Sequence, residues 1–264
     1  QADQVVLATV RGQVEALSAS NGARAWSVNV GQPLSAGVGF DGTTAAVITA
    51  KTELLAIRDG NVLWRVPLQH QSSTPPLVAG GRVFVVGSDH TVSAYDGNNG
   101  FLLWNQKSNL PSGRLALSQP SLLMPAYGAL FVGVAGNVVG FNPDTGEALG
   151  DIPLASPRGV TDLSQVVDVL MPASRVGNSL CARAYQATVG CMDLPGSKLT
   201  WVQPHVGSSG VAGNAQVVVG ADNQDVLTAW SRQNGQPVWK NETLKYRRLS
   251  SQLIVGDSVI VGDT

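Results

Sequence analysis

Two cysteines are the residues of this chain whose type and spacing predict a covalent bond. They are Cys181 and Cys191, the only cysteines among the 264 residues. Residues that oppose each other on neighbouring antiparallel strands have Cα atoms about 4.5–5.5 Å apart, which is within the range of a disulfide. A disulfide would indicate an oxidising compartment such as the periplasm. The alternative is a pair of buried thiols that fill apolar positions.

Other residue types that could do chemistry do not form a recognisable site. His70, His90 and His205 are scattered and have no metal-ligating neighbours in the sequence. The chain has no nucleophile elbow and no Cys–His signature. Its Asp-Gly pairs resemble fragments of a calcium loop, but hairpin turns explain them better. We therefore expect no catalytic residue, no metal ion and no cofactor, and the sequence favours a binding scaffold over an enzyme.

One sequence phrase occurs six times along the chain, and the strands and turns that it predicts determine where the cysteines and histidines lie. Each copy has an apolar strand with a small residue at its third position, then a turn that ends in glycine, then a tryptophan. The small residues are Ala16, Ala56, Ala94, Gly140, Cys191 and Ala229. The glycines are Gly22, Gly60, Gly100, Gly146, Gly196 and Gly235. The tryptophans are Trp26, Trp64, Trp104, Trp201 and Trp239, with Gly150 in this place in the fourth copy. A period of about 40 residues with Gly and Trp at fixed offsets indicates a β-propeller.

Each part of the phrase has a physical reason. The glycines supply the positive φ of a tight hairpin turn. We expect the small residue to relieve crowding near the propeller axis and the tryptophan to cover the flank between neighbouring blades. Cys181 lies ten residues before the small residue of its copy, on the preceding strand. In a hairpin it therefore faces Cys191, which favours the disulfide.

The repeat predicts an all-β fold, a β-propeller of four-stranded antiparallel blades. The first copy shows three strands, and residues 252–255 and 257–263 look like the first two strands of a seventh blade. We expect residues 1–264 to form a single propeller domain that is incomplete at both ends. It would hold about six and a half blades of an eight-bladed parent at ~40 residues per blade. The first blade would lack its opening strand, the seventh would be cut short and the eighth would be absent.

Composition excludes several classes of partner. Charged residues are 13% and hydrophobic residues 44%, with 30 glycines, which suits a compact β protein with many turns. The net charge of −1 gives no electrostatic footprint for nucleic acid or an anionic membrane surface. No apolar run approaches the ~20 residues of a membrane span. The chain opens on Gln1 without a signal peptide, which is compatible with removal of a leader.

Two insertions break the rhythm of the repeat, at residues 108–119 and 155–168. Each follows an outer strand and precedes an inner one, so we expect both links on the same face, on neighbouring blades. Extra loop length on one face commonly marks the binding face of a repeat protein. Ordinary variation in the length of surface loops is the alternative.

The repeated phrase resembles the PQQ-type (quinoprotein) propeller repeat, and the two enlarged links narrow the resemblance. With Ser118-Gln119-Pro120 after one link and the segment 163–168 in the other, the chain resembles the BamB family of outer-membrane lipoproteins. The likeness covers essentially the whole chain. It implies a non-catalytic propeller at the periplasmic face of the outer membrane, anchored by an N-terminal lipid on a cysteine outside this sequence. It also implies binding to the POTRA domains of BamA, contact with other Bam components and help in the folding of outer-membrane proteins, which are themselves candidate partners when unfolded.

The resemblance also implies the residues of the partner contact. In the family, a Leu/Arg segment in the first link and an acidic segment in the second carry the contact with BamA. The first matches 114–117, in which the order of Arg and Leu differs from the usual pattern. The second matches Asp168, which is followed by Val169-Leu170 where family members can carry a second acidic residue. The candidate partner-binding residues are Arg114, Leu115, Leu117, Ser164, Gln165 and Asp168. We hypothesise that Arg114 and Asp168 make charge-paired contacts and that Leu115 and Leu117 are apolar anchors.

Two other functions share the repeat. A PQQ-type quinoprotein dehydrogenase would carry adjacent cysteines beneath its cofactor and a calcium site, whereas these cysteines lie ten positions apart. A general periplasmic peptide-binding propeller is the second alternative. Cofactor absorbance would support the first, and failure to capture BamA from a periplasmic extract would support the second.

Overall fold

Apolar runs bounded by turn residues form β-strands throughout the part of the chain that the structure describes. The computed structural model describes residues 3–108, 117–156 and 167–263, with 25 strands and no helix in these ranges. The strands up to residue 107 are β1 (Gln4–Ala8), β2 (Gln13–Ser18), β3 (Arg24–Asn29), β4 (Gly39–Phe40), β5 (Ala45–Ile48), β6 (Glu53–Arg58), β7 (Asn61–Pro67), β8 (Leu77–Ala79), β9 (Arg82–Val86), β10 (Thr91–Asp96) and β11 (Leu102–Lys107). The others are β12 (Leu123–Ala126), β13 (Ala129–Val134), β14 (Asn137–Phe141), β15 (Ala148–Pro153), β16 (Val169–Val176), β17 (Ser179–Ala184), β18 (Thr188–Asp193), β19 (Lys198–Pro204), β20 (Ala212–Gly213), β21 (Val217–Ala221), β22 (Leu227–Ser231), β23 (Pro237–Asn241), β24 (Leu253–Val255) and β25 (Ser258–Ile260).

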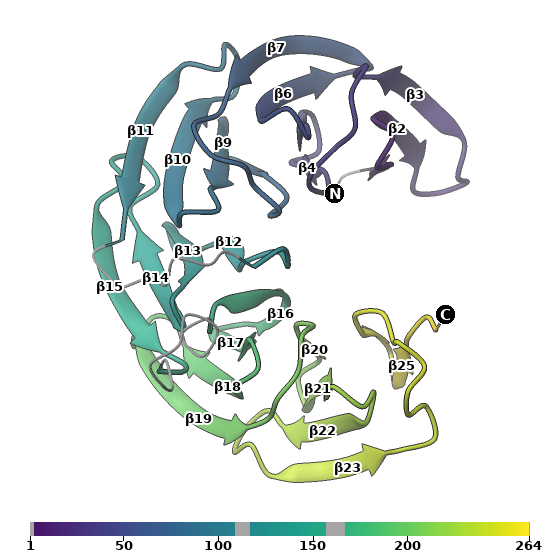
Figure 1. Cartoon of the computed structure of the whole chain (residues 1–264), viewed down its shortest axis with the longest axis vertical. Helices are drawn as coiled ribbons and strands as arrows, with labels where there is room; N and C mark the ends of the chain where they lie inside the picture. Colours follow the sequence, from purple (N-terminus) through teal and green to yellow (C-terminus); the bar gives the residue numbers. More distant parts are fainter. Residues whose placement is uncertain (1–2, 109–116, 157–166, 264) are drawn as a thin grey trace. The chain divides into compact units, whose positions relative to one another are not determined.

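Within each sheet, strands that follow each other in sequence are hydrogen-bonded neighbours (Figure 1). Five four-stranded sheets are formed by β4–β7, β8–β11, β12–β15, β16–β19 and β20–β23. Strands β1–β3 form a three-stranded sheet and β24–β25 a two-stranded one. The described pairings are antiparallel. These strand counts agree with the prediction of four-stranded blades, with three strands in the first sheet and two in the last.

Contacts divide the chain into two compact units. Unit 1 contains residues 1–108, 123–130 and 142–147, and unit 2 contains the rest. In unit 1, strand β5 is buried on both faces. Ala45 and Val47 pack in one apolar cluster while Ala46 and Ile48 pack in another, as side chains that alternate across a strand must. In unit 2, one apolar cluster includes both cysteines and a second is centred on β21 and β22. The single-domain organisation stays a prediction.

The pairing of the third and fourth strands repeats from sheet to sheet. In the five phrases that have a tryptophan, the small residue faces it, as in Ala56↔Trp64 and Ala94↔Trp104. A bulge follows the small residue in all six copies. The strand register therefore explains the small residue more directly than the predicted crowding at the axis does. A short side chain leaves space for the indole on the opposing strand.

The tryptophan joins its sheet to the turn of the next sheet, as predicted. The indole N–H of Trp64 donates to the Gly97 carbonyl at 2.9 Å, and that of Trp201 donates to the Arg232 carbonyl at 2.7 Å. A Cβ on Gly100 would lie 2.8 Å from the Trp64 ring, so the turn glycine is required where the indole packs. Trp104 repeats this arrangement against Gly146, 2.6 Å from a Cβ built there.

The fourth copy shows what happens without the tryptophan. Gly150 faces Gly140 in that sheet. The next phrase glycine, Gly196, has no indole within 4 Å and instead donates its N–H to Asp193 at 2.9 Å. Loss of the tryptophan and loss of the indole contact at the following turn thus go together. In the described residues, no helix is long and apolar enough to cross a membrane.

Candidate interaction surface at the two enlarged links

The chain segments that leave the two enlarged links lie side by side in unit 2. The Leu122 N–H donates to the Val169 carbonyl at 2.8 Å, and the Met171 N–H donates to the Pro120 carbonyl at 2.9 Å. Ser121 and Leu170 form an antiparallel bridge between these bonds. Main-chain hydrogen bonds therefore fix the two exits to each other. We call the paired segments 120–122 and 169–171 the shared platform of the two links.

Both ends of the second link meet at Gly136, in the turn between β13 and β14. The Gly136 carbonyl accepts hydrogen bonds from the N–H groups of Leu154 and Ala155, at 2.9 and 3.0 Å. A Cβ on Gly136 would overlap the Ala155 carbonyl oxygen and lie 3.0 Å from the Val167 side chain. Gly136 also has a φ of +81°, which glycine adopts without strain. The link therefore starts and returns at the same point.

Asp168, at the return of the second link, is a buried carboxylate with an exposed fraction of 4%. Its Oδ1 accepts the Ala135 N–H at 3.0 Å, and its carbonyl accepts the Tyr185 N–H at 2.9 Å. The side chain thus fastens the exit of the second link to Ala135, which lies next to Gly136 in the turn between β13 and β14. This geometry makes Asp168 a residue that positions the link.

The structure describes only part of the predicted partner-binding set. Arg114, Leu115, Ser164 and Gln165 lie outside the described residues. Leu117 is described and half-buried, three positions before Pro120 on the shared platform. The structure therefore places Leu117 and Asp168 at the ends of segments that are hydrogen-bonded to each other.

A polar cluster at the start of the first link was missed by the sequence reasoning. The His70 Nε2 and the Lys107 Nζ each lie 3.5 Å from the same Asp89 oxygen, and the Thr91 hydroxyl donates to it at 2.5 Å. Partial burial alone would raise the pKa of Asp89, but hydrogen bonds from Thr91 and the charges of His70 and Lys107 outweigh it and lower the pKa. No spacing rule joins His70 to Asp89, which meet because the Ser88 N–H donates to the Gln71 carbonyl at 2.8 Å.

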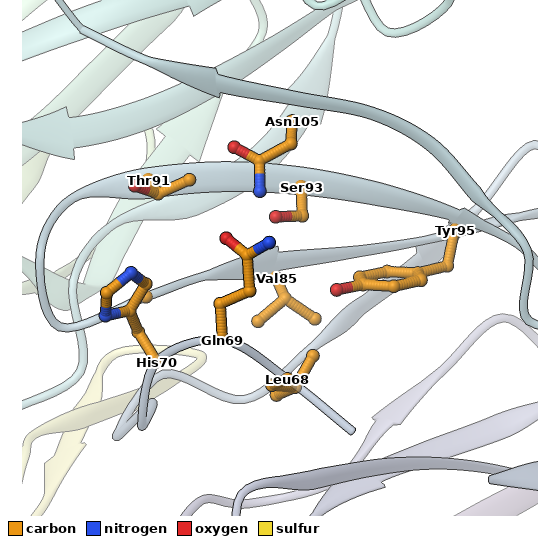
Figure 2. A pocket seen from close by; sticks show the side chains of 9 residues that line it. Leu68, Gln69, His70, Val85, Thr91, Ser93, Tyr95 and Asn105 are labelled. Atoms are coloured by element: carbon orange, nitrogen blue, oxygen red, sulfur yellow. The ribbon is translucent and has the colours of Figure 1, made fainter. Parts of the chain in front are cut away.

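This cluster borders a small cavity in the third sheet. Figure 2 shows the Gln69 amide directed toward Ser93 and Asn105, with the Tyr95 ring to one side. The cavity volume is about 20 Å³, which is the space of a single water molecule. The cavity is therefore too small to hold a ligand. The cluster fixes Lys107, the last residue of β11, beside Asp89.

A second unpredicted feature is a buried cation in unit 2. Arg183 is fully buried, and its Nη1 donates to the His205 carbonyl at 3.3 Å. A Cβ on Gly220 would lie 2.5 Å from its guanidinium. Burial lowers the pKa of Arg183 to about 10, so it is charged at neutral pH. Burial, and then the charge of Arg183, lowers the pKa of His205 to about 4. His205 is therefore neutral at neutral pH, with its ring edge-on to Trp230 at 4.7 Å.

The His205 environment predicts a pH dependence of stability. Its pKa in the folded chain, about 4, lies below the ordinary 6.5, so the unfolded chain binds the extra proton first. The contribution of neutral His205 to the free energy of unfolding is fully present above pH 6.5. It is lost as the pH falls from 6.5 to 4, and the loss is roughly 2 kcal/mol once the partial exposure of the ring is allowed for. Urea unfolding across this range measures the loss. His205→Phe keeps a ring against Trp230 and cannot titrate, so its profile should be flatter, and parallel profiles would contradict the assignment.

Comparison with known proteins identifies the family. A family model described as outer membrane protein assembly factor BamB matches residues 10–241. The chain belongs to the BamB family. It is 33% identical over 263 residues to the outer membrane protein assembly factor BamB of Burkholderia pseudomallei, covering 99% of this chain and 69% of that protein. It is 31% identical over 264 residues to the BamB of Bordetella pertussis, covering 99% and 68%.

A solved structure confirms the fold class. The crystal structure of BamB from Moraxella catarrhalis superposes with a TM-score of 0.89 at 24% identity, covering 100% of this chain and 80% of that one. The predicted all-β propeller of four-stranded blades is therefore confirmed. The relatives are named as outer membrane protein assembly factors, and membership of this family agrees with the prediction that the chain is not an enzyme. The alternative of a quinoprotein dehydrogenase is thereby set aside.

Proposed function

We propose that this chain is a scaffold of the outer-membrane β-barrel assembly machinery, that it binds the POTRA domains of BamA through the two enlarged links, and that it assists the folding and insertion of outer-membrane proteins. Membership of the BamB family supports the assembly role. The observation that carries the binding site is the pairing of the two link exits at Pro120–Leu122 and Val169–Met171. Two insertions joined at their base can act as one surface, which a partner can contact in a single orientation.

The proposed roles follow from position and residue type. Arg114 supplies an orienting charge, and Leu115 and Leu117 supply apolar anchors of the kind that dominate interface energies. Ser164 and Gln165 supply polar contacts at the rim. Asp168 is buried against Ala135, so we assign it to fixing the direction of the second link.

A binding measurement tests this proposal. The combined variant R114A/L115A/L117A should bind a POTRA fragment of BamA from the same organism at least tenfold more weakly, because apolar anchors and a paired charge each contribute more than about 1 kcal/mol. A matched control, R24A/L102A/L149A, removes one arginine and two leucines that are exposed on outer strands and should keep the affinity. Biolayer interferometry with the immobilised fragment measures both. Unchanged affinity of the first variant would sink the proposal.

Asp168 is tested separately because its expected role is indirect. Asp168→Asn should weaken POTRA binding and also lower the melting temperature, since the Ala135 N–H loses a charged acceptor. Asp151→Asn, on the exposed part of β15, is the control. Normal POTRA binding by Asp168→Asn would show that the direction of the link does not matter for the partner.

The proposed location is the periplasmic face of the outer membrane, which fits relatives that are named as outer membrane protein assembly factors. We further propose attachment through an N-terminal lipid in the parent protein. The disulfide between Cys181 and Cys191 is compatible with the oxidising periplasm. Fractionation of cells that make the parent protein, with and without substitution of the lipid-bearing cysteine, tests the anchor.

A further inference from the structure

A groove in unit 1 lies at the ends of the strands of the third sheet opposite to Lys107, the last residue of β11. It has a volume of about 320 Å³ and lies between the β8–β9 turn and the β12–β13 turn. Its lining includes Arg82, Phe84, Pro125, Tyr127, Leu130 and Pro143. In the register of the third sheet, Arg82 pairs with Asp96 while Lys107 pairs with Thr91, at the other end of β10. Within the third sheet, the groove therefore lies at the end of β10 opposite to the pair formed by Thr91 and Lys107.

Tyr127 occupies a backbone conformation that glycine adopts in equivalent turns. Its φ is +50°, in the two-residue turn between β12 and β13. The same first turn position is taken by Gly80, Gly177 and Gly256, with φ of +59°, +54° and +58°. A bulky L-residue in this region is strained, and such strain gathers at binding and functional sites. The side chain is 50% exposed and lines the groove, so its ring can contact a bound ligand.

The guanidinium of Arg82 lines the groove, and one of its nitrogen atoms has no hydrogen-bond partner among the described residues. Its Nη2 lies 2.6 Å from the Asp144 Oδ1, and its Nη1 donates to the Gly80 carbonyl at 3.4 Å. Its Nε is buried and has no hydrogen-bond partner among the described residues. Nε and Nη2 form one edge of the guanidinium, to which a carboxylate can bind with both oxygens. Asp144 is 67% exposed, so water can solvate it readily if another carboxylate takes that edge.

Arg82 and Phe84 lie two residues apart on β9 and both line the groove. Residues at i and i+2 share one face of a strand. The charge of Arg82 and the ring of Phe84 are therefore spaced like alternate side chains of an extended peptide. We propose that the groove binds an extended peptide segment that carries an aromatic side chain two residues from an acidic side chain. The aromatic ring packs against Tyr127 and the prolines, above Phe84, which is buried and lines the groove from below. The carboxylate pairs with the Nε–Nη2 edge of Arg82.

The test uses short peptides that are acetylated and amidated, so that the acidic side chain is their only carboxylate. The probe is Gly-Phe-Gly-Asp-Gly, and the two comparison peptides replace Asp by Asn or Phe by Ala. Binding to the 264-residue chain is measured by isothermal titration calorimetry. The probe should bind saturably, and each comparison peptide should bind at least tenfold more weakly.

Three variants give expectations of opposite sign. Arg82→Met should weaken binding of the probe at least tenfold. Tyr127→Gly should also weaken it tenfold while the melting temperature holds or rises, because glycine relieves the positive φ. Asp144→Asn should bind the probe as tightly as the parent chain or more tightly, because it releases Arg82. The proposal is overturned if the probe does not bind saturably, if Arg82→Met and Tyr127→Gly bind it normally, or if Asp144→Asn abolishes binding.

Discussion

Replacing Gly235 by alanine is expected to lower the free energy of unfolding by roughly 3 kcal/mol, from two causes that act at one position. The φ of Gly235 is +72°, which costs an L-residue about 1–2 kcal/mol. A Cβ there would also lie 2.6 Å from the ring of Trp201, which is buried and held by its bond to the Arg232 carbonyl. Overpacking against such a ring adds about 1–3 kcal/mol. Urea unfolding followed by tryptophan fluorescence measures the sum.

Gly22 is a matched control for the Gly235 substitution. It is the turn glycine of the first phrase and has nearly the same φ, +71°, but no atom lies within 4 Å of a Cβ built on it. Gly22→Ala should therefore cost only the backbone strain, about 1–2 kcal/mol. The difference between the two variants isolates the contact between the tryptophan and the next turn. Equal losses for the two variants would mean that this contact does not stabilise the fold.

The repeated phrase made most of the fold predictable, because the same contacts recur in each copy. Trp64 and Gly100 are 36 positions apart, yet each belongs to a fixed place in a phrase, and their contact repeats as Trp104 with Gly146. The pairing of Cys181 with Cys191 followed from the same logic and is confirmed. Periodicity converts a contact between distant residues into a local rule, so one sequence is enough to predict it.

The contacts that break the repeat could not be predicted in this way. Arg82 meets Asp144 and His70 meets Asp89 through the particular lengths of turns and links, which no period encodes. No position of the repeat predicts a buried cation, yet the guanidinium of Arg183 is fully buried against Gly220. The sequence suggests a charge-paired contact with a partner for Asp168, and only the structure shows that this carboxylate is buried and accepts the Ala135 N–H. Contacts that depart from the repeat are not encoded by its period, which is why the repeat predicts the fold but gives little guidance to the candidate site.

Removing the disulfide is expected to lower the free energy of unfolding by about 3 kcal/mol, because the cross-link closes a short loop in the unfolded chain. Cys181 and Cys191 are cross-strand partners with Cα atoms 4.0 Å apart and a sequence separation of 10. Both are fully buried beside Val189 and Trp201. The double variant C181A/C191A should therefore unfold at a lower urea concentration than the parent chain.

The second phrase supplies the reason for choosing alanine at both positions. Ala46 and Ala56 form the pair at the same place in the second sheet, and both are fully buried there. An alanine pair thus fits this register, so the loss in C181A/C191A reports mainly the cross-link. Adding dithiothreitol should bring the parent chain close to the double variant and leave the variant unchanged, with reduction checked by a mass increase of two hydrogens. A parent chain that is fully reduced yet equally stable would show that the packing of the two strands alone holds this hairpin.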